Sequence, residues 1–297
     1  MLDALAQPAM ADTATPTAAT HSALYAPRLS LAACVRAYLS HSTLGADLAP
    51  AQRYNYFPAA PMCAIQWIIL GASIVVQRGD ERIHEPVPTQ FFNGPHTAPI
   101  VSFNPGPVQG FMLVLTPDAV QAMTGVDMSQ FVDRQVPLRQ VFDATWQAMA
   151  QTVMDAPDDA VRIQLIEAFL EPRWAAVRSA AMPRADRYRL WAEGLALRAA
   201  TSGMGQSLRQ IERRIKAWAG LPLRDLRRFS HLEAAYFQVR QAQNSASFNW
   251  ADAAADAGFA DQAHLCRETR RITGLTPTEL RRAIDEDECF WVYRIVR

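Results

Sequence analysis

The sequence predicts an α+β protein, with a β-rich N-terminal barrel or sandwich domain followed by an all-α C-terminal domain with two helix-turn-helix motifs. Three observations lead to this fold class. Short β-prone runs separated by Pro and Gly occupy residues 53–115, and apolar residues at helical spacing dominate from residue 117 onward. Two pairs of helices with a turn between them follow residue 184. The chain of 297 residues is long enough for two domains.

Composition excludes several classes of protein. Half of the residues are hydrophobic and a fifth are charged, which is typical of a packed globular core. The longest apolar run, at residues 68–76, is interrupted by Gly71 and Ser73, so we expect no membrane span, and we find no secretory signal pattern. The four Cys residues are scattered and fit neither a disulfide framework nor a zinc knuckle. We therefore expect a cytoplasmic protein.

The formal net charge of zero conceals an uneven distribution of charge. Residues 1–172 contain 8 Arg and 15 acidic residues, which is a net charge of −7. Residues 173–282 contain 18 Arg, one Lys and 10 acidic residues, which is a net charge of +9, and the last fifteen residues carry −2. An acidic half joined to a basic half indicates a polyanionic partner, although a solvated Arg-rich helical domain has the same composition.

The N-terminal half divides into a leader and a β-rich domain. Residues 1–24 are rich in Ala, Thr and Pro with few large apolar residues, which predicts a disordered leader. A β-rich domain is expected over residues 25–142, with a short helix at Ala32–Leu39. The expected strands are Ala64–Leu70, Ser73–Gln77, Thr89–Asn93, Ile100–Phe103 and Gly110–Leu115.

Helical periodicity follows the strands. Pro117 and Gly125 delimit a short helix over Asp118–Met123, because Pro suits the first turn of a helix and Gly its end. Longer helices are predicted over Asp143–Met154 and Asp158–Leu170. We expect residues 143–183 to form a helical linker to the C-terminal domain.

The clearer helix-turn-helix pattern lies at residues 249–272. Gly258 is placed to end the first helix in a left-handed conformation, and Asp261 is placed to cap the second. The inward positions of the second helix are Leu265, Thr269 and Ile272, and the mainly outward ones are Gln262, Ala263, Arg267, Arg270 and Arg271. Arg and Gln are the side chains that read guanine and adenine edges in the major groove, so the second helix is a candidate recognition helix.

A looser pattern of the same kind precedes it at residues 190–219. Ser207 and Gln210 form a capping box at the start of its second helix. The outward side chains of that helix are Arg209, Glu212, Arg213 and Lys216. A long helix over residues 225–243 is expected to connect the two units, which together define an all-α domain over residues 184–284.

Over residues 207–282 the chain resembles the DNA-binding domain of AraC/XylS-type bacterial transcription regulators. The second unit carries the family signature at Ala254, Gly258, Phe259, Asp261, Gln262, His264, Leu265, Arg267, Arg270, Arg271, Gly274, Thr276 and Pro277. The first unit matches at Ser207, Arg209, Ile211, Arg213, Ile215 and Lys216. In the connecting helix, His231 stands where the family commonly has Arg.

The resemblance implies a sequence-specific transcription regulator that binds double-stranded DNA with two recognition helices in the major groove. It implies base contacts at Arg209, Glu212, Arg213, Gln262, Ala263 and Arg267, with Lys216, Arg270 and Arg271 as further DNA-binding residues. Residues 54–142 resemble the β-rich domain that precedes many such DNA-binding domains, which implies a small-molecule effector or a homodimer. It implies no cofactor.

Other readings of the sequence stay open. An enzyme or a small-molecule-binding protein can use a pocket of the β domain beside a helical domain that no longer reads bases. Against an enzyme, His84 and His96 lack the spacing and the further ligands of a cupin-type metal site. The aromatic residues of the β domain are expected to pack between strands, and the alternative is that they line an apolar pocket. The tail at residues 285–297 runs from acids to aromatics and is predicted to fold back on the protein, with the basic domain or a dimer partner as candidate surfaces.

Overall fold

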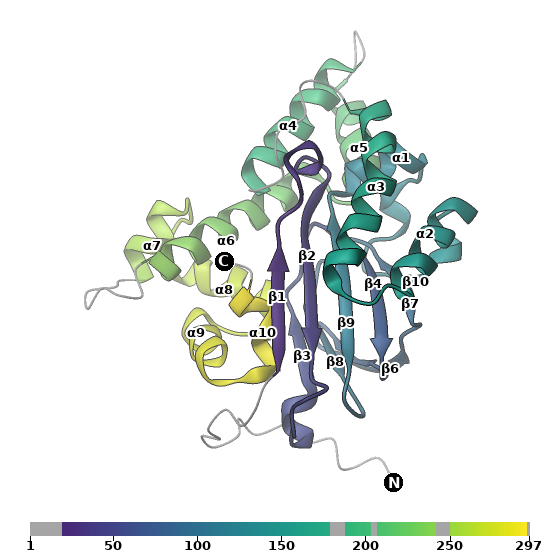
Figure 1. Cartoon of the computed structure of the whole chain (residues 1–297). Helices are drawn as coiled ribbons and strands as arrows, with labels where there is room; N and C mark the ends of the chain where they lie inside the picture. The colour runs from purple at the N-terminus through teal and green to yellow at the C-terminus, as the bar shows by residue number, and fades with distance from the viewer. Residues whose placement is uncertain (1–19, 179–187, 203–206, 242–249, 296–297) are drawn as a thin grey trace.

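The computed structural model describes residues 20–178, 188–202, 207–241 and 250–295. A β domain of two sheets precedes a helical half (Figure 1). The larger sheet has the strand order β1-β2-β9-β4-β7-β10 and the smaller one β3-β8-β5-β6, with antiparallel pairing throughout. The strands are β1 (His21–Tyr25), β2 (Val35–Ser42), β3 (Tyr54–Phe57), β4 (Cys63–Leu70), β5 (Ile74–Arg78), β6 (Glu81–Pro86), β7 (Gln90–Asn93), β8 (Ile100–Phe103), β9 (Gln109–Leu115) and β10 (Gln135–Pro137).

The predicted fold class is confirmed, and the structure corrects its N-terminal elements. Strand β2 replaces the helix expected at Ala32–Leu39, because its side chains alternate between two buried environments. Tyr38 packs under the helices that cover the sheet, whereas Ala37 and Leu39 face the space between the two sheets. Strand β1 lies inside the leader predicted over residues 1–24, and residues 1–19 of that leader lie outside the described residues. Strands β3, β6 and β10 are additional to those predicted.

Three helices cover the outer face of the larger sheet (Figure 1): α1 (Pro117–Thr124), α2 (Ala144–Met154) and α3 (Asp159–Val177). Trp67 of β4 is fully buried beneath them, and its Nε1 donates a hydrogen bond to the carbonyl oxygen of Ala150 at 2.9 Å. The apolar stripe of α3 supplies Ile166 and Leu170 to the same core. The described part of the linker predicted over residues 143–183 is therefore a layer of the β domain.

The helical half follows the predicted order. Its helices are α4 (Tyr188–Thr201), α5 (Leu208–Ala219), α6 (Leu223–Gln241), α7 (Trp250–Asp256), α8 (Gln262–Thr273) and α9 (Pro277–Glu286). Helices α4 and α5 form the first helix-turn-helix, α7 and α8 form the second, and α6 connects them. The 3-10 turn η6 (Glu288–Phe290) and the short helix α10 (Trp291–Ile295) follow.

Buried polar contacts join the helical half to the β domain. Asp118 of α1 forms an ion pair with Arg198 of α4 and accepts a hydrogen bond from Trp191 Nε1 at 2.8 Å. Glu233 of α6 forms an ion pair with Arg36 of β2 at 2.7 Å. Helix α5 also packs against α1 and the 3-10 turn η3 at residues 128–130. The first helix-turn-helix is thus fixed on the β domain.

We predict that Arg198→Ala lowers the free energy of unfolding by about 3–5 kcal/mol, because it leaves the buried Asp118 carboxylate without its cation. The side chains of Arg198 and Asp118 are only 15% and 6% exposed. Chemical denaturation of the full chain measures the change. Arg189→Ala is the control, because its ion pair with Glu193 is exposed and contributes less than about 1 kcal/mol. Equal losses for both variants would contradict a stabilising role for the Asp118–Arg198 pair.

Candidate nucleic-acid interface and regulatory cavity

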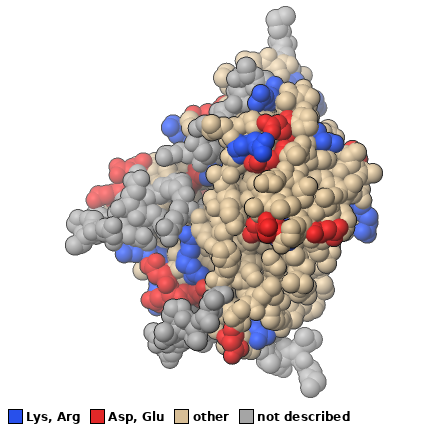
Figure 2. All heavy atoms as spheres, in the orientation of Figure 1, with Lys and Arg blue, Asp and Glu red and all other residues tan. Residues whose placement is uncertain are grey.

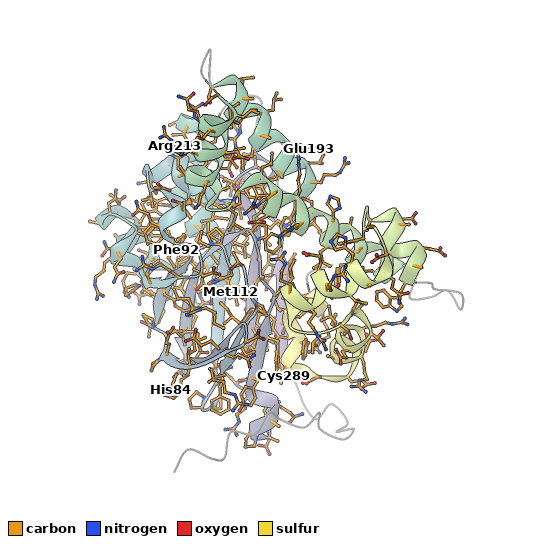
Figure 3. All side chains as sticks on the ribbon, turned by 180° about the vertical axis from the view of Figure 1, so that it is seen from behind. His84, Phe92, Met112, Glu193, Arg213 and Cys289 are labelled. Atoms are coloured by element: carbon orange, nitrogen blue, oxygen red, sulfur yellow. The ribbon has the colours of Figure 1, made fainter. Side chains whose placement is uncertain are left out.

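Helix α5 presents the first set of predicted DNA-binding side chains. The capping box at its start is present: Ser207 N donates to Gln210 Oε1 at 2.9 Å, and Gln210 N donates to Ser207 Oγ at 3.4 Å. Ile215 and Ala219 are buried against the rest of the protein, which fixes the rotation of the helix. All four side chains predicted to bind DNA from this helix are exposed: Arg209, Glu212, Arg213 and Lys216. Arg213 lies at the outer end of the helical half in Figure 3.

Helix α8 presents the second set. Asp261 caps it by accepting a hydrogen bond from His264 N at 2.6 Å, and Gly274 ends it with a φ of 80°. The predicted inward residues Leu265, Thr269 and Ile272 are all buried. The exposed residues are Gln262, Ala263, Arg267 and Arg270.

Arg271 differs from the other predicted DNA-binding residues, because it is half-buried. Its guanidinium lies 3.0 Å from the Glu268 carboxylate and 5.7 Å from the centre of the Phe229 ring on α6. The outward direction expected for this side chain is therefore corrected: it packs toward the connecting helix.

The corner of the second unit is built as its sequence predicts. Gly258 has a φ of 80°, which glycine adopts without strain and which ends α7. Phe259 is buried at the corner, where the rings of His231 and His264 contact it edge-on. A Cβ on Gly258 would lie 3.1 Å from His231 Nδ1, so the turn and the connecting helix are packed together. His264 therefore has the packing role expected of it.

Charged side chains of both signs are spread over the helical half in Figure 2, whereas the strands show few. Arg224, Arg227 and Arg228 are exposed along α6, between the two recognition helices. Arginines placed there suit contacts to phosphate oxygens, which position a protein on DNA without reading its sequence.

The structure also contains a cavity of about 530 Å³ between the two sheets, where sequence reasoning favoured packed aromatic side chains. Ala37, Ala64 and Gly110 occupy inner positions of the larger sheet, so little side-chain volume fills the space. Phe57 and Phe91 line the cavity, whereas Phe92 packs in the core on the other face of the sheet. Ala64 and Gly110, which fall in two of the predicted strands, were the signal in the sequence for this space. Its size is that of a small-molecule site.

The helical half closes this cavity. Phe229 and Leu232 of α6, Ile272 of α8, and Leu280 and Ile284 of α9 belong to its lining. A backbone hydrogen bond ties the β domain to the end of α8: Ala59 N donates to the carbonyl oxygen of Ile272 at 2.8 Å. A ligand in the cavity would therefore touch the elements that carry the second recognition helix.

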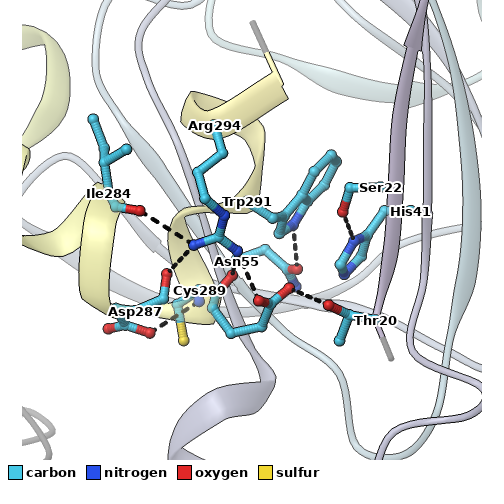
Figure 4. Close-up of polar contacts among 10 residues, drawn as sticks. Thr20, Ser22, His41, Asn55, Ile284, Asp287, Cys289, Trp291 and Arg294 are labelled. Atoms are coloured by element: carbon cyan, nitrogen blue, oxygen red, sulfur yellow. Dashed lines mark hydrogen bonds and ion pairs between the residues drawn. The ribbon is translucent and has the colours of Figure 1, made fainter. Parts of the chain in front are cut away.

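The tail of the chain folds back on the protein, and it packs against α6 and α9 of the basic domain as well as against the β domain. The indole of Trp291 is buried and stacks on the His41 ring at a centroid distance of 4.2 Å. Its Nε1 donates to Asn55 Oδ1 at 2.9 Å (Figure 4). Phe290 stacks on Tyr56 of β3 at 4.5 Å. The aromatic residues of the tail thus complete one side of the space between the sheets.

Polar contacts hold the tail in this position. Arg294 donates to the carbonyl oxygens of Ile284 and Asp287 and forms an ion pair with Glu288 at 2.7 Å (Figure 4). Tyr236 of α6 donates its hydroxyl to the carbonyl oxygen of Tyr293 at 2.7 Å. The tail therefore touches the β domain, the connecting helix and α9 at once.

His41 makes this junction sensitive to pH. Burial, with smaller contributions from Arg294 and His21, lowers the pKa of His41 to about 3. In the unfolded chain the pKa of this residue is near 6.5, so acid protonates the unfolded chain more readily than the folded one. The contribution of His41 to the free energy of unfolding is therefore complete above pH 6.5 and is lost as the pH falls toward 3. We predict that the free energy of unfolding falls by roughly 2 kcal/mol from this group between pH 6.5 and 5.

Denaturant titrations of His41→Phe at several pH values measure this dependence. The variant keeps an aromatic ring beside Trp291 but loses the titrating group, so its stability should fall less steeply with acid. His84→Phe is the matched control, because His84 is exposed on β6. A slope for His41→Phe equal to that of the unmodified chain would contradict the assignment.

Among the described residues, no group of three or more His, Cys, Asp and Glu side chains could hold a metal ion. No described helix is long and apolar enough to cross a membrane.

Cys34, Cys63 and Cys289 are buried, and burial raises the pKa of each thiol, so none of the three is an activated nucleophile.

Residues 201–283, from the end of α4 to α9, match the family described as a helix-turn-helix domain. They form a domain of the AraC type, as the resemblance in their sequence implies. The class of protein that carries this domain is the DNA-binding transcription regulator.

No curated protein matches the chain. Among solved structures it is similar to a substituted variant of apo ToxT from Vibrio cholerae, at 10% identity and a TM-score of 0.38, over 82% of this chain and 96% of that one. ToxT from the same organism bound to (E)-4-(8-methylnaphthalen-1-yl)but-3-enoic acid matches at 8% identity and a TM-score of 0.35, over 94% and 100%. ToxT bound to an unsaturated fatty acid matches at 10% and 0.33, over 76% and 93%. These TM-scores are low, so the similarity establishes no shared ligand.

Proposed function

We propose that this protein is a sequence-specific transcription regulator in which a small molecule bound by the β domain controls DNA binding by the helical half. The observation that carries the proposal is the AraC-type domain, whose two candidate recognition helices both turn predicted DNA-binding side chains to solvent. Helices α5 and α8 enter successive segments of the major groove on one face of the DNA, and α6 sets their separation.

The roles of the exposed side chains follow from their positions. Arg213 of α5 and Arg267 of α8 contact base edges, together with Arg209, Glu212, Gln262 and Ala263. Lys216 and Arg270 lie farther along the same helices and neutralise phosphate charge. Arg271 supports α8 through Phe229 and Glu268 and does not contact bases directly.

The β domain is the regulatory part of the proposal. Its cavity is closed by α6, α8 and α9, so an occupant that shifts any of these helices changes the placement of a recognition helix. Homodimerisation through the β domain is a further part of the proposal, and DNA binding at two adjacent sites would accompany it.

Selection of bound fragments from a genomic DNA library tests the function directly. We expect the full-length protein to enrich one motif of two half-sites about one helical turn apart. If the protein retains DNA without enriching a motif, and the retention falls steeply with salt, the helices bind phosphate without reading bases. Absence of retention would contradict the regulator and favour the alternative, a small-molecule-binding protein or enzyme that uses the cavity.

Two arginine variants separate base reading from phosphate binding. Arg267→Ala should cost about 1–3 kcal/mol on the selected site and relax the preference at one base pair. Arg227→Ala should weaken binding evenly across sequences and reduce the salt dependence. Fluorescence anisotropy on matched and mutated duplexes measures both effects.

Arg139→Ala is the control for net charge, because Arg139 is exposed in the β domain and far along the chain from either recognition helix. It should leave both affinity and preference unchanged. Unchanged binding of Arg267→Ala to its selected site would exclude α8 as a reading helix.

A further inference from the structure

Three polar side chains cluster in the wall of the cavity at the edge of the larger sheet. Asn93 ends β7, Gln135 is its direct partner across the strand pair on β10, and His96 lies three residues after Asn93. Phe92 packs into the core on the opposite face of the sheet, so the alternation of the strand turns Asn93 toward the cavity. We call Asn93, His96 and Gln135 the amide–imidazole cluster.

Within the described part of the chain, some atoms of the cluster have no hydrogen-bond partner although they are buried. They are Asn93 Oδ1, Gln135 Oε1 and both ring nitrogens of His96. Asn93 and His96 are only 5% and 8% exposed. Buried polar atoms are nearly always paired, and each unpaired one costs about 1–3 kcal/mol. Unpaired atoms grouped around one cavity are therefore those of a site that a ligand completes.

The charges around the cluster select the kind of ligand head. Neither amide carries a charge, and the unpaired amide oxygens of Asn93 and Gln135 are acceptors that need a donor on the head group. Asp133 lies 3.8 Å from His96 Nδ1 and accepts two hydrogen bonds from Thr97. Although burial opposes its ionisation, the proximity of His96 and the Thr97 hydrogen bonds lower the pKa of Asp133, so it is a carboxylate at neutral pH. An anionic head group would meet this charge.

The basic side chains of the lining lie elsewhere. Arg36 belongs to β2 and is held by Glu233, and Arg281 belongs to α9. Neither is part of the strand pair that carries the cluster. The remaining lining is mostly apolar and includes Phe91, Met112 and Val114, which suits a hydrocarbon body.

We propose that the cavity binds an apolar molecule with one uncharged hydrogen-bonding head, such as a hydroxyl or a carboxamide, and that this head sits on the amide–imidazole cluster. The inference deepens the proposed regulatory function and rests on it. His96 and Ala60 exchange backbone hydrogen bonds at 2.9 and 3.0 Å, and the neighbouring Ala59 bonds to Ile272 of α8 at 2.8 Å. The backbone hydrogen bonds of Ala60 and Ala59 therefore link His96, where the head group would bind, to Ile272 of the second recognition helix.

Nonanamide and nonanoate form a matched pair of probes, because they share a chain and differ mainly in the charge of the head. Isothermal titration calorimetry with the full-length protein should give at least tenfold tighter binding of nonanamide. Asn93→Leu and Gln135→Leu should each weaken nonanamide binding about tenfold and reduce the difference between the two probes. Asn93→Leu should also raise the melting temperature of the ligand-free protein, because it removes an unpaired buried oxygen.

Asn104→Leu is the matched control, because Asn104 is equally buried and lines the same cavity but follows β8 of the other sheet. It should retain the preference for nonanamide. Equal or tighter binding of nonanoate, no binding of either probe, or equal losses in Asn93→Leu and Asn104→Leu would overturn the proposal. DNA binding of the same preparations is measured in parallel. If the protein still binds DNA when the ligand proposal fails, the proposed function as a regulator is retained. If it does not bind DNA, the proposed function is wrong whatever the ligand result.

Discussion

The inner faces of the two sheets carry too little side-chain volume to pack against each other, and the helical half supplies the missing surface. Ala37, Ala64 and Gly110 leave the space open, and α6, α8, α9 and the tail residues 288–295 close it. Burial of apolar surface dominates folding, so this shared boundary holds the recognition helices against the β domain. The two halves form one structural unit with a cavity inside it. The helices that close this cavity determine how the helical half is placed on the β domain.

Ionic and polar contacts give this closure its geometry. The pairs Asp118–Arg198 and Arg36–Glu233 are well shielded from solvent, and each joins a strand or helix of the β domain to a helix of the other half. Buried ion pairs add little net stability compared with apolar packing, but breaking one is costly, which favours a single arrangement. The amide–imidazole cluster differs from these pairs, because some of its buried polar atoms are unpaired. The free energy lost by leaving them unpaired is recovered when a ligand forms hydrogen bonds with them.

Much of the helical half could be predicted from the sequence because its signals are local. The caps at Ser207, Asp261 and Thr276 and the turn at Gly258 each depend on a few neighbouring residues, and all four have the expected conformations. The buried positions of α5 and α8 fix the rotation of each helix, and the exposed positions could be predicted from the same pattern. Arg271 was the exception, because its direction depends on Phe229, which lies more than forty positions earlier in the chain.

The β domain was harder to predict because its contacts join distant segments. Strand β2 has apolar residues on both faces, so its pattern does not distinguish a strand from a buried helix. The docking of α2 and α3 on the sheet, the cavity and the position of the tail all depend on tertiary packing. No local pattern specifies which face of a sheet a later helix will cover.

The position of Trp291 has a consequence for biosynthesis. It donates to Asn55 across a separation of 236 residues, so the ribosome makes the strands long before the residue that completes their interior. At about 5–20 residues per second this delay is roughly 12–50 s. During translation the nascent strands must therefore persist with exposed apolar faces, a period in which a chaperone has access to them. The order of synthesis makes a segment that emerges late the one that finishes the first domain.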